Sequence, residues 1–472
     1  LLVITAVILF IWQPGLGGRA KAAPLPKEDY WLSFRAGEDN NAVKEIQHVK
    51  GPVSLKYWGQ MIGELNDWGT NSKSGILVIG QALYFASDDQ FYRLDKEGAV
   101  TGQVSLEGFV GYSARPVYTG AVIIVPLEGG GLQAIAPDSM ETVWLADGPG
   151  EWQAGEGSYS LQNTSSLYFY NGLCYSLTLA VDENWESIGG YVQAVNASTG
   201  ETVWLYKDLP REDGAAGFNM TGSVVMDHWL LVGGEGGDLM VLDAQKGELL
   251  HSLPLGAKIN SDLVTQGYRV FFTTYDGRLI QSEFDPATKE SRLISDTTFA
   301  LKSNSSPVIF GSKLYVGGLA EYGDWEAGTA ATGVLALIDM ATLQVAEQHM
   351  VEGDLQSSPL LIAGRDDKPY VYFTSNSGSG SLLVLDGSQV KEAFVPEPAE
   401  AQFTLFSPVT DQEGTVYYAL DSGYLFAIAE SVPPPSAEVS SPIIWYMVAA
   451  GGLILAGVLA FLVIRAGKKK KS

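Results

Sequence analysis

The chain has 472 residues, of which 54 are Gly and 46% are hydrophobic, and its net charge is −25. This length and apolar content suffice for a large core, and the many glycines favour short strands joined by tight turns. The negative charge disfavours a nucleic-acid partner, because it is repelled by phosphate backbones. The single cysteine, Cys174, excludes an intrachain disulfide, and its apolar strand pattern predicts a buried side chain rather than a nucleophile.

The N-terminal end has the pattern of a secretory signal peptide. Residues 1–12 are apolar, and small residues follow at Ala20 and Ala22, so we predict a signal peptide over 1–22. No basic residue precedes the apolar run, and we therefore expect the natural start to lie further upstream. The alternative is an uncleaved anchor, but the break at residues 14–18 (PGLGG) favours cleavage.

Short strand patterns recur from residue 61 to residue 430. The clearest unit is 231–243 (LVGGEGGDLMVLD), in which an apolar strand, a Gly-rich turn and a second apolar strand follow one another. Eight units share an aliphatic–aromatic second strand, roughly 40 to 57 residues apart, a spacing typical of four-stranded propeller blades. These second strands are at 83–85, 122–125, 173–175, 229–232, 270–272, 314–316, 371–373 and 416–418.

The last repeat ends at Ile428 without a fourth strand. Residues 53–58 (VSLKYW) form an isolated strand pattern with Trp58 at the place where other units have Trp144 and Trp204. We therefore assign 23–60 as a lead-in and closing strand that completes the last blade and removes an open sheet edge. The sequence predicts an all-β propeller of eight blades, with seven as the alternative.

Several segments resemble one known repeat family. Residues 191–204 (YVQAVNASTGETVW), 237–248 and 306–316 are similar to the PQQ-like β-propeller repeat, and many units begin with Ser as at Ser306, Ser358 and Ser407. The run WLSFR at 31–35, followed by Asn40 and Asn41, resembles the segment that precedes such propellers. The resemblance covers about residues 30–430 and implies the fold, which serves both enzymes and scaffolds.

The resemblance also implies a possible enzyme. Quinoprotein dehydrogenases of this fold hold the quinone PQQ with Ca²⁺, an Asp base, a stacking Trp and often adjacent cysteines. The residues themselves predict no cofactor, no metal and no catalytic residue, because one cysteine excludes an adjacent pair and the four histidines are too widely spaced for a metal motif. The sequence thus favours binding over catalysis, with a quinone- or Ca²⁺-dependent oxidoreductase as the alternative.

Two long insertions and one connection combine tryptophan with acids. The insertions are 176–190 and 319–333, the connection is 147–164, and all three are expected on one face of the propeller. Exposed aromatic rings beside carboxylates suit sugars or peptides. The alternative is that the tryptophans pack down on the sheet. The ligand-binding candidates are Trp152, Asp182, Glu183, Trp185, Tyr322, Asp324, Trp325 and Glu326.

The C-terminal end has the pattern of a membrane anchor. Residues 431–442 form a Pro/Ser stalk, and 443–464 are uncharged and apolar, which as a helix would span about 33 Å. The basic tail 465–472 places the C-terminus in the cytoplasm. We predict a single-pass type I protein of the plasma membrane whose extracellular propeller is a binding or scaffold module at a bacterial cell surface, with an unidentified carbohydrate, peptide or protein partner.

Overall fold

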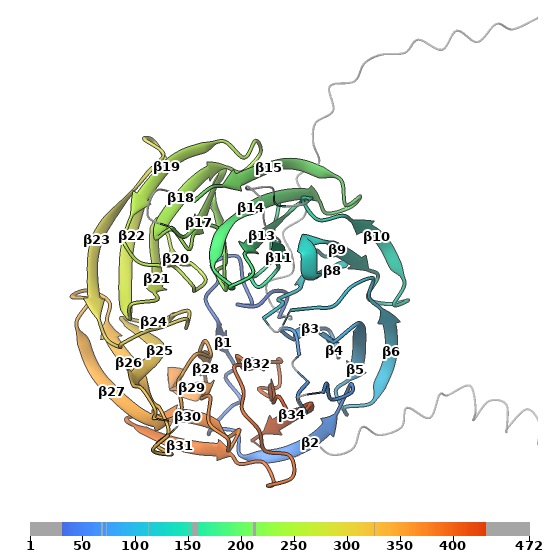
Figure 1. Cartoon of the computed structure of the whole chain (residues 1–472). Coiled ribbons are helices and arrows are strands. Elements are labelled where there is room, and N and C mark those ends of the chain that lie inside the picture. The colour runs from blue at the N-terminus through green and yellow to red at the C-terminus, as the bar shows by residue number, and fades with distance from the viewer. Residues whose placement is uncertain are drawn as a thin grey trace, which may run out of the picture. The chain divides into compact units, whose positions relative to one another are not determined.

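The computed structural model describes residues 31–430, except for residues 68, 72, 112, 151, 153–158, 211–213 and 325. Eight sheets are arranged around a central axis (Figure 1), which confirms the eight-bladed β-propeller. Within each blade the four main strands run antiparallel from the axis outward. The described residues also include two short 3-10 turns, η1 (Glu128–Gly130) and η2 (Arg365–Asp367).

Each blade has four main strands, and their bounds are as follows. Blades one to four contain β3 (Leu77–Ile79), β4 (Ala82–Ser87), β5 (Gln90–Asp95) and β6 (Val100–Ser105); β7 (Val117–Tyr118), β8 (Ile123–Pro126), β9 (Leu132–Ile135) and β10 (Thr142–Ala146); β11 (Ser160–Gln162), β12 (Tyr168–Tyr170), β13 (Leu173–Val181), β14 (Ser187–Asn196) and β15 (Thr202–Asp208); β16 (Val224–Met226), β17 (Trp229–Gly233), β18 (Asp238–Asp243) and β19 (Leu249–Pro254). In blade three, β11 and β12 both pair with β13.

The remaining blades follow the same order. Blades five to eight contain β20 (Val264–Gln266), β21 (Arg269–Thr274), β22 (Arg278–Asp285) and β23 (Glu290–Thr298); β24 (Val308–Phe310), β25 (Lys313–Glu321), β26 (Thr332–Asp339) and β27 (Val345–Glu352); β28 (Leu360–Ala363), β29 (Pro369–Thr374), β30 (Leu382–Asp386) and β31 (Gln389–Phe394); β32 (Val409–Thr410), β33 (Val416–Ala419), β34 (Tyr424–Ala429) and β2 (Leu55–Met61).

The burial of the strands follows from stacking blade against blade. A middle strand such as β18 is covered on both faces by neighbouring blades, so it is buried along almost its whole length and reads as a continuous apolar run. An outer strand such as β27 is mostly exposed and more polar. The core therefore consists of layers between adjacent blades rather than one central cluster.

Three outer tryptophans fasten one blade to the next. Each indole N–H donates to a backbone carbonyl of the following blade: Trp58 to Lys96 (2.7 Å), Trp144 to Ala197 (3.1 Å) and Trp204 to Ala244 (3.0 Å). A glycine in the left-handed conformation lies under each ring; at Gly98, with φ +88°, a β-carbon would press on the Trp58 ring. Trp58 therefore joins blade eight to blade one as the other two join their neighbours.

The ring is closed by the N-terminal part of the chain, as predicted. β2 pairs antiparallel with β34 and becomes the outermost strand of blade eight. The strand begins two residues later than the predicted 53–58 and continues to Met61. An additional short strand, β1 (Val43–Glu45), pairs parallel with β28 as a fifth strand of blade seven; three residues are too few to show a pattern, and the sequence did not predict it.

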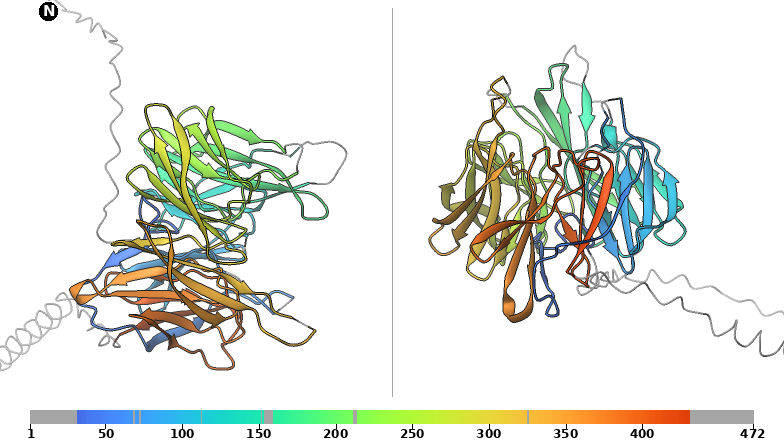
Figure 2. Two further views of the ribbon diagram at one scale, coloured as in Figure 1. Left: turned by 90° about the vertical axis from the view of Figure 1, so that its left-hand side faces the viewer. Right: turned by 90° about the horizontal axis from the view of Figure 1, so that it is seen from below.

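The two faces of the propeller differ in what they display (Figure 2). Because the strands alternate in direction, the long β13–β14 and β25–β26 hairpins end on one face, which we call the hairpin face. The segment 31–54 crosses the opposite face, which we call the N-terminal face. The expectation that the two insertions share one face is met by these hairpins.

The predicted membrane elements fall beyond the part of the chain that the structure describes. These are the signal peptide 1–22, the stalk 431–442, the transmembrane helix 443–464 and the tail 465–472. Within the described ranges, no helix has the length and apolar character needed to cross a membrane.

Candidate functional site

The β13–β14 hairpin ends in a tight turn built on Asp182. Its Oδ1 accepts the backbone N–H groups of Asn184 (2.8 Å) and Glu186 (2.9 Å), and the N–H of Trp185 donates to the Asp182 carbonyl (3.1 Å). The N–H of Glu186, followed by that of Asn184, holds the pKa of Asp182 below its usual value. The Asp182 carboxylate thus shapes the turn, and Glu183 and Glu186 are exposed beside it.

Trp185 occupies an unfavourable backbone position for a large side chain. Its φ is +64°, and its side chain is 74% exposed. After a turn of this kind the left-handed position usually holds glycine. The other large apolar residues with positive φ in the described ranges, Met140, Met220 and Leu343, are all buried. Packing therefore offsets the backbone cost at those three positions but not at Trp185.

The β25–β26 hairpin presents the second candidate group. Tyr322 is 69% exposed, and Glu326 is exposed as well. Asp324 and Thr329 exchange backbone hydrogen bonds of 3.0 and 2.9 Å, and Asp324 Oδ1 accepts the N–H of Ala327 (3.0 Å). Asp324, like Asp182, therefore shapes its own turn. Trp325 lies outside the described residues.

Trp152 differs from the other candidates because its ring is buried. Only 4% of the residue is exposed, and the ring packs edge-on against Tyr191, with centroids 5.2 Å apart. Lys207 Nζ lies 4.2 Å from the Trp152 ring centre, and a β-carbon at Gly189 would collide with the ring. Trp152 therefore packs against the blade, which is the alternative considered for the tryptophans in the sequence analysis, and it is not part of the exposed candidate surface.

The two hairpins share a face but not a pocket. They belong to blades three and six, with blades four and five between them, and both extend from the hairpin face in Figure 2. Trp185 and Tyr322 are thus two separate contact points. A ligand that touches both has to span two blades, which favours a macromolecule over a small sugar.

A ring of eight equivalent positions, six of them polar, surrounds the axis, and only its leading serines were noted in the sequence. Each member lies two residues before the start of one inner strand, namely β3, β7, β12, β16, β20, β24, β28 or β32. In this order the members are Gly75, Arg115, Ser166, Gly222, Asp262, Ser306, Ser358 and Ser407. The last three accept hydrogen bonds through their side chains: the N–H groups of Asp262, Ser306 and Ser358 each donate to the Oγ of the next serine in the ring at 2.9 Å. The leading serines thus connect neighbouring blades. The whole ring could have been found in the sequence from this constant position, two residues before each inner strand.

The charged members of the ring form an ion pair in which Asp262 is buried and Arg115 is partly buried. Arg115 Nη1 lies 3.3 Å from Asp262 Oδ1, and the Ser166 hydroxyl donates to the same carboxylate at 3.0 Å. Burial raises the pKa of Asp262, and the charge of Arg115 opposes that rise. This pair was not among the candidates from sequence, because its members are separated by 147 residues.

Arg35 closes the axis from the N-terminal face. Its Nη1 donates to the Pro359 carbonyl (3.0 Å) and its Nη2 to the Pro307 carbonyl (2.8 Å). Burial lowers the pKa of Arg35 to about 10, against the opposing charge of Asp262. The WLSFR run, noted in the sequence only for its resemblance, therefore supplies the plug of the propeller.

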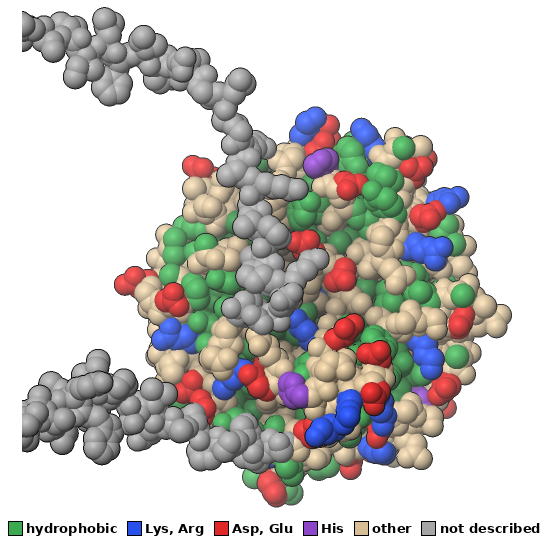
Figure 3. All heavy atoms as spheres, turned by 180° about the vertical axis from the view of Figure 1, so that it is seen from behind, with side chains coloured by type: hydrophobic (Ala, Val, Ile, Leu, Met, Phe, Trp, Pro, Cys, Tyr) green, Lys and Arg blue, Asp and Glu red, His purple; other side chains and the backbone are tan. Residues whose placement is uncertain are grey.

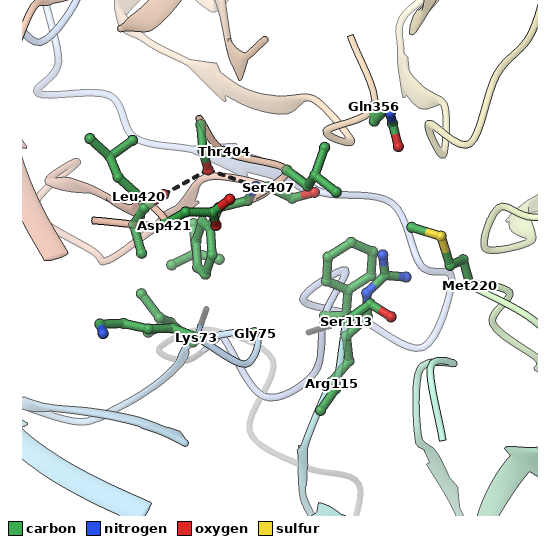
Figure 4. A pocket seen from close by; sticks show the side chains of 17 residues that line it. Lys73, Gly75, Ser113, Arg115, Met220, Gln356, Thr404, Ser407, Leu420 and Asp421 are labelled. Carbon is green, nitrogen blue, oxygen red and sulfur yellow. Dashed lines mark hydrogen bonds between the residues drawn. The ribbon is translucent and has the colours of Figure 1, made fainter. Parts of the chain in front are cut away.

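A cavity of about 250 Å³ lies next to this plug (Figure 4). Figure 4 shows Arg115 and Met220 on one side of it and Lys73 and Asp421 on the other. Lys73 Nζ donates to the Ile62 carbonyl (2.6 Å) and to Asn71 Oδ1 (2.9 Å), and burial lowers its pKa to about 8. The Lys73 amine is therefore engaged by the protein itself.

The described residues do not fit a Ca²⁺-bound quinone. In the described part of the chain no three His, Cys, Asp or Glu side chains lie close enough together to hold a metal ion. Asp421 is the one carboxylate among the described residues lining the cavity. Cys174 is buried, and burial raises its pKa. That the protein takes no cofactor stays a prediction, and a direct assay can test it.

Comparisons with known proteins agree on the fold. A family model described as outer membrane protein assembly factor BamB matches residues 189–432, whereas no curated protein matches the sequence. Similar solved structures include a quinohemoprotein alcohol dehydrogenase from Pseudomonas putida (12% identity, TM-score 0.64, covering 87% of this chain and 82% of that chain), BamB from Moraxella catarrhalis (13%, 0.54, 80% and 100%) and a europium-containing methanol dehydrogenase (9%, 0.62, 83% and 89%). At these identities the similarity shows the fold alone, which enzymes and an assembly factor share.

Proposed function

The chain belongs to the PQQ-like repeat family described as outer membrane protein assembly factor BamB, and we propose that it is a scaffold that binds a protein partner through its hairpin face. We extend the proposal to its location: residues 443–464 anchor the chain in a bacterial plasma membrane, and the propeller lies outside the cell. The contact residues are Trp185 and Tyr322, with the acids beside them.

The conformation of Trp185 is the observation that supports this proposal most directly. The left-handed backbone conformation of a large side chain costs on the order of 1 kcal/mol or more in conformational free energy. Because the Trp185 side chain is mostly exposed, burial does not offset this cost. Strained residues of this kind cluster at binding and active sites. Tryptophan is also among the residues that contribute most to protein–protein binding, at about 2 kcal/mol or more each.

The spacing of the two hairpins supports a protein as the partner. The Asp182 and Asp324 turns fix both hairpin ends through backbone hydrogen bonds, so Trp185 and Tyr322 are presented on defined loops. Rigid loops on a rigid scaffold are a common arrangement for binding surfaces. A partner that covers blades three to six would contact both, and binding through both contacts would be stronger than through either one.

Site-specific crosslinking in producing cells tests the proposal. A photo-crosslinking amino acid is placed at position 185 or 322 of the full-length chain, and at Leu145 on the outer wall as the control, because Leu145 is also exposed. We expect the same discrete adduct from positions 185 and 322 and none from 145. Trp185→Ala should then reduce the adduct formed from position 322. Different adducts from the two hairpins, or equal yields from all three positions, would contradict a shared partner.

A dehydrogenase assay separates this function from the enzymatic alternative. The purified full-length protein is incubated with added quinone, Ca²⁺ and a set of alcohols, and reduction of an electron-accepting dye is followed. The scaffold proposal expects no turnover above that of a heat-treated sample. Substrate-dependent dye reduction would instead favour an oxidoreductase.

The proposed location has its own test. Protease added to intact cells should release a fragment of about propeller size, cut in the 431–442 stalk. Complete protection of the propeller in unbroken cells would show that it lies inside.

A further inference from the structure

A second cleft, of about 600 Å³, lies on the N-terminal face, the face shown in Figure 3. One wall is the N-terminal segment, including Glu38 and Asp39. The other wall consists of the inner strands and turns of blades two to five, including Phe169, Asp227 and Tyr268. The cleft is larger than the axial cavity and lies on the face opposite the two hairpins, so neither the family resemblance nor the proposed function makes use of it.

The wall formed by the N-terminal segment is fixed in place by its backbone. The Tyr168 hydroxyl donates to the Glu38 carbonyl (2.8 Å), and the N–H of Thr265 donates to the Asp39 carbonyl (3.0 Å). The Asn40 side-chain amide donates to two further carbonyls, of Ser223 and Leu263, at 3.0 Å each. The backbone groups are thus used for the fold, and the carboxylates of Glu38 and Asp39 remain exposed at the rim.

The opposite wall combines aromatic rings with a third carboxylate. Tyr268 is 44% exposed, and its hydroxyl donates to Asp227 Oδ2 (2.8 Å). Tyr118 and Phe169 line the cleft beside it, and both are half-buried. The cleft is therefore a groove of aromatic side chains between two acidic edges.

The charge of the cleft is negative. Its described lining residues include three carboxylates, those of Glu38, Asp39 and Asp227, and one cation, Lys44, whose Nζ lies 5.8 Å from the centre of the Trp31 ring. Among the described residues, none of the three carboxylates lies within a salt bridge to a basic side chain. A basic ligand would thus be attracted by the net negative charge of these lining residues.

We propose that this cleft binds an extended, basic, proline-containing segment of a partner protein. Grooves lined with aromatic side chains suit the polyproline II conformation, which needs little ordering on binding. Lysine side chains of the segment would reach the carboxylates on both edges, and their ammonium groups would also be attracted by the tyrosine rings. The surface is independent of the hairpin face, and one scaffold could thereby hold two partners.

Binding of a defined peptide tests the inference. The probe is a fluorescein-labelled octapeptide of alternating lysine and proline, followed by anisotropy with the full-length protein, and a glutamate-for-lysine peptide is the charge control. We expect saturable binding of the lysine peptide alone. The double variant Glu38→Gln, Asp227→Asn should weaken it at least tenfold, and both positions are exposed, so the fold should be retained.

Two further variants separate this cleft from general electrostatic attraction. Glu183→Gln combined with Glu186→Gln removes two exposed carboxylates from the hairpin face, and it should leave peptide binding unchanged. Tyr268→Ala should weaken binding about threefold or more, whereas Tyr268→Phe should retain most of it. Equal losses from the two carboxylate pairs would overturn the proposal, because they would show attraction by net charge alone.

A small cation is the other occupant that the experiment can identify. If spermidine displaces the peptide completely and Tyr268→Ala has no effect, the cleft is a simple cation site and the peptide proposal is wrong. A negative result here leaves the hairpin-face crosslinks unaffected, and Trp185→Ala should not change peptide binding. Failure of this inference and failure of the proposed function are therefore distinguishable.

Discussion

At the axis of this propeller, charged side chains such as Arg35 and Asp262 are buried and bonded to other parts of the protein. At the rim, the aromatic side chains of Trp185 and Tyr322 are exposed. Charged residues are the ones that usually suggest chemistry, and aromatic residues the ones that usually suggest a core. The comparison teaches that in this chain the charged groups of the axis stabilise the fold, whereas the aromatic groups of the rim are available for binding.

Deleting the axial segment or, separately, a rim loop should give the largest difference in thermal stability. Removing residues 23–60 takes away Arg35, β1 and all of β2 except Met61. It leaves blade eight with an open edge and should abolish cooperative unfolding or cause aggregation. Replacing residues 322–331 by two glycines should leave the thermal transition nearly unchanged. Circular dichroism melting of both variants measures this. A cooperative transition at the original temperature for the 23–60 deletion would show that other residues close the ring.

A single substitution at the axis should also lower the free energy of unfolding strongly. Arg35→Ala leaves the carbonyls of Pro307 and Pro359 without this donor and removes a buried charge, so we expect a loss of about 3–5 kcal/mol in the free energy of unfolding. The control is Arg292→Ala, at an exposed residue paired with Glu283, for which about 0–1 kcal/mol is expected. Urea unfolding measures both. Equal losses would mean that the axial plug has no special role.

The buried amine of Lys73 should give the stability a pH dependence. The unfolded chain keeps this proton up to about pH 10.5 and the folded chain releases it near pH 8, so the unfolded state binds more protons between these values. The contribution of Lys73 to stability therefore rises with pH in this window, on the order of 2 kcal/mol.

Lys73→Met should remove that rise. The measurement is the free energy of unfolding of both proteins in urea at pH 7, 8, 9 and 10, since other titrating groups cancel in the difference. Lys246→Met, at an exposed position, is the control and should follow the wild-type curve. A constant difference between wild type and Lys73→Met across the series would contradict the lowered pKa.

The smallest effect on stability should come from the rim. Trp185→Gly relieves a left-handed backbone and removes an exposed ring, so the free energy of unfolding should stay the same or rise by up to about 1 kcal/mol. Leu343→Gly is the matched control, because Leu343 has a similar φ but is buried, and it should lose about 3 kcal/mol or more. A clear destabilisation by Trp185→Gly would show that the ring supports the fold after all.

Much of the fold could be predicted from local patterns. The second strands, the glycine turns and the final unit without a fourth strand are each visible within a few tens of residues. Trp58 also matched Trp144 and Trp204, so the closing strand could be assigned correctly across the whole length of the chain. Strand pairing between sequence neighbours repeats the same local chemistry in every blade, so the sequence determined the propeller fold and favoured eight blades over seven, and the structure shows eight.

Only the tertiary structure decided which tryptophans and which charged side chains are buried. Trp152 and Trp185 stand in similar acidic surroundings in the sequence, but Trp152 packs against Tyr191, whereas a left-handed turn directs Trp185 into solvent. Arg35 meets carbonyls 272 and 324 residues away, because the blades converge only when the ring closes. A local sequence pattern shows to which strand a residue belongs. Whether its side chain is buried depends on which residues of the other blades pack against it.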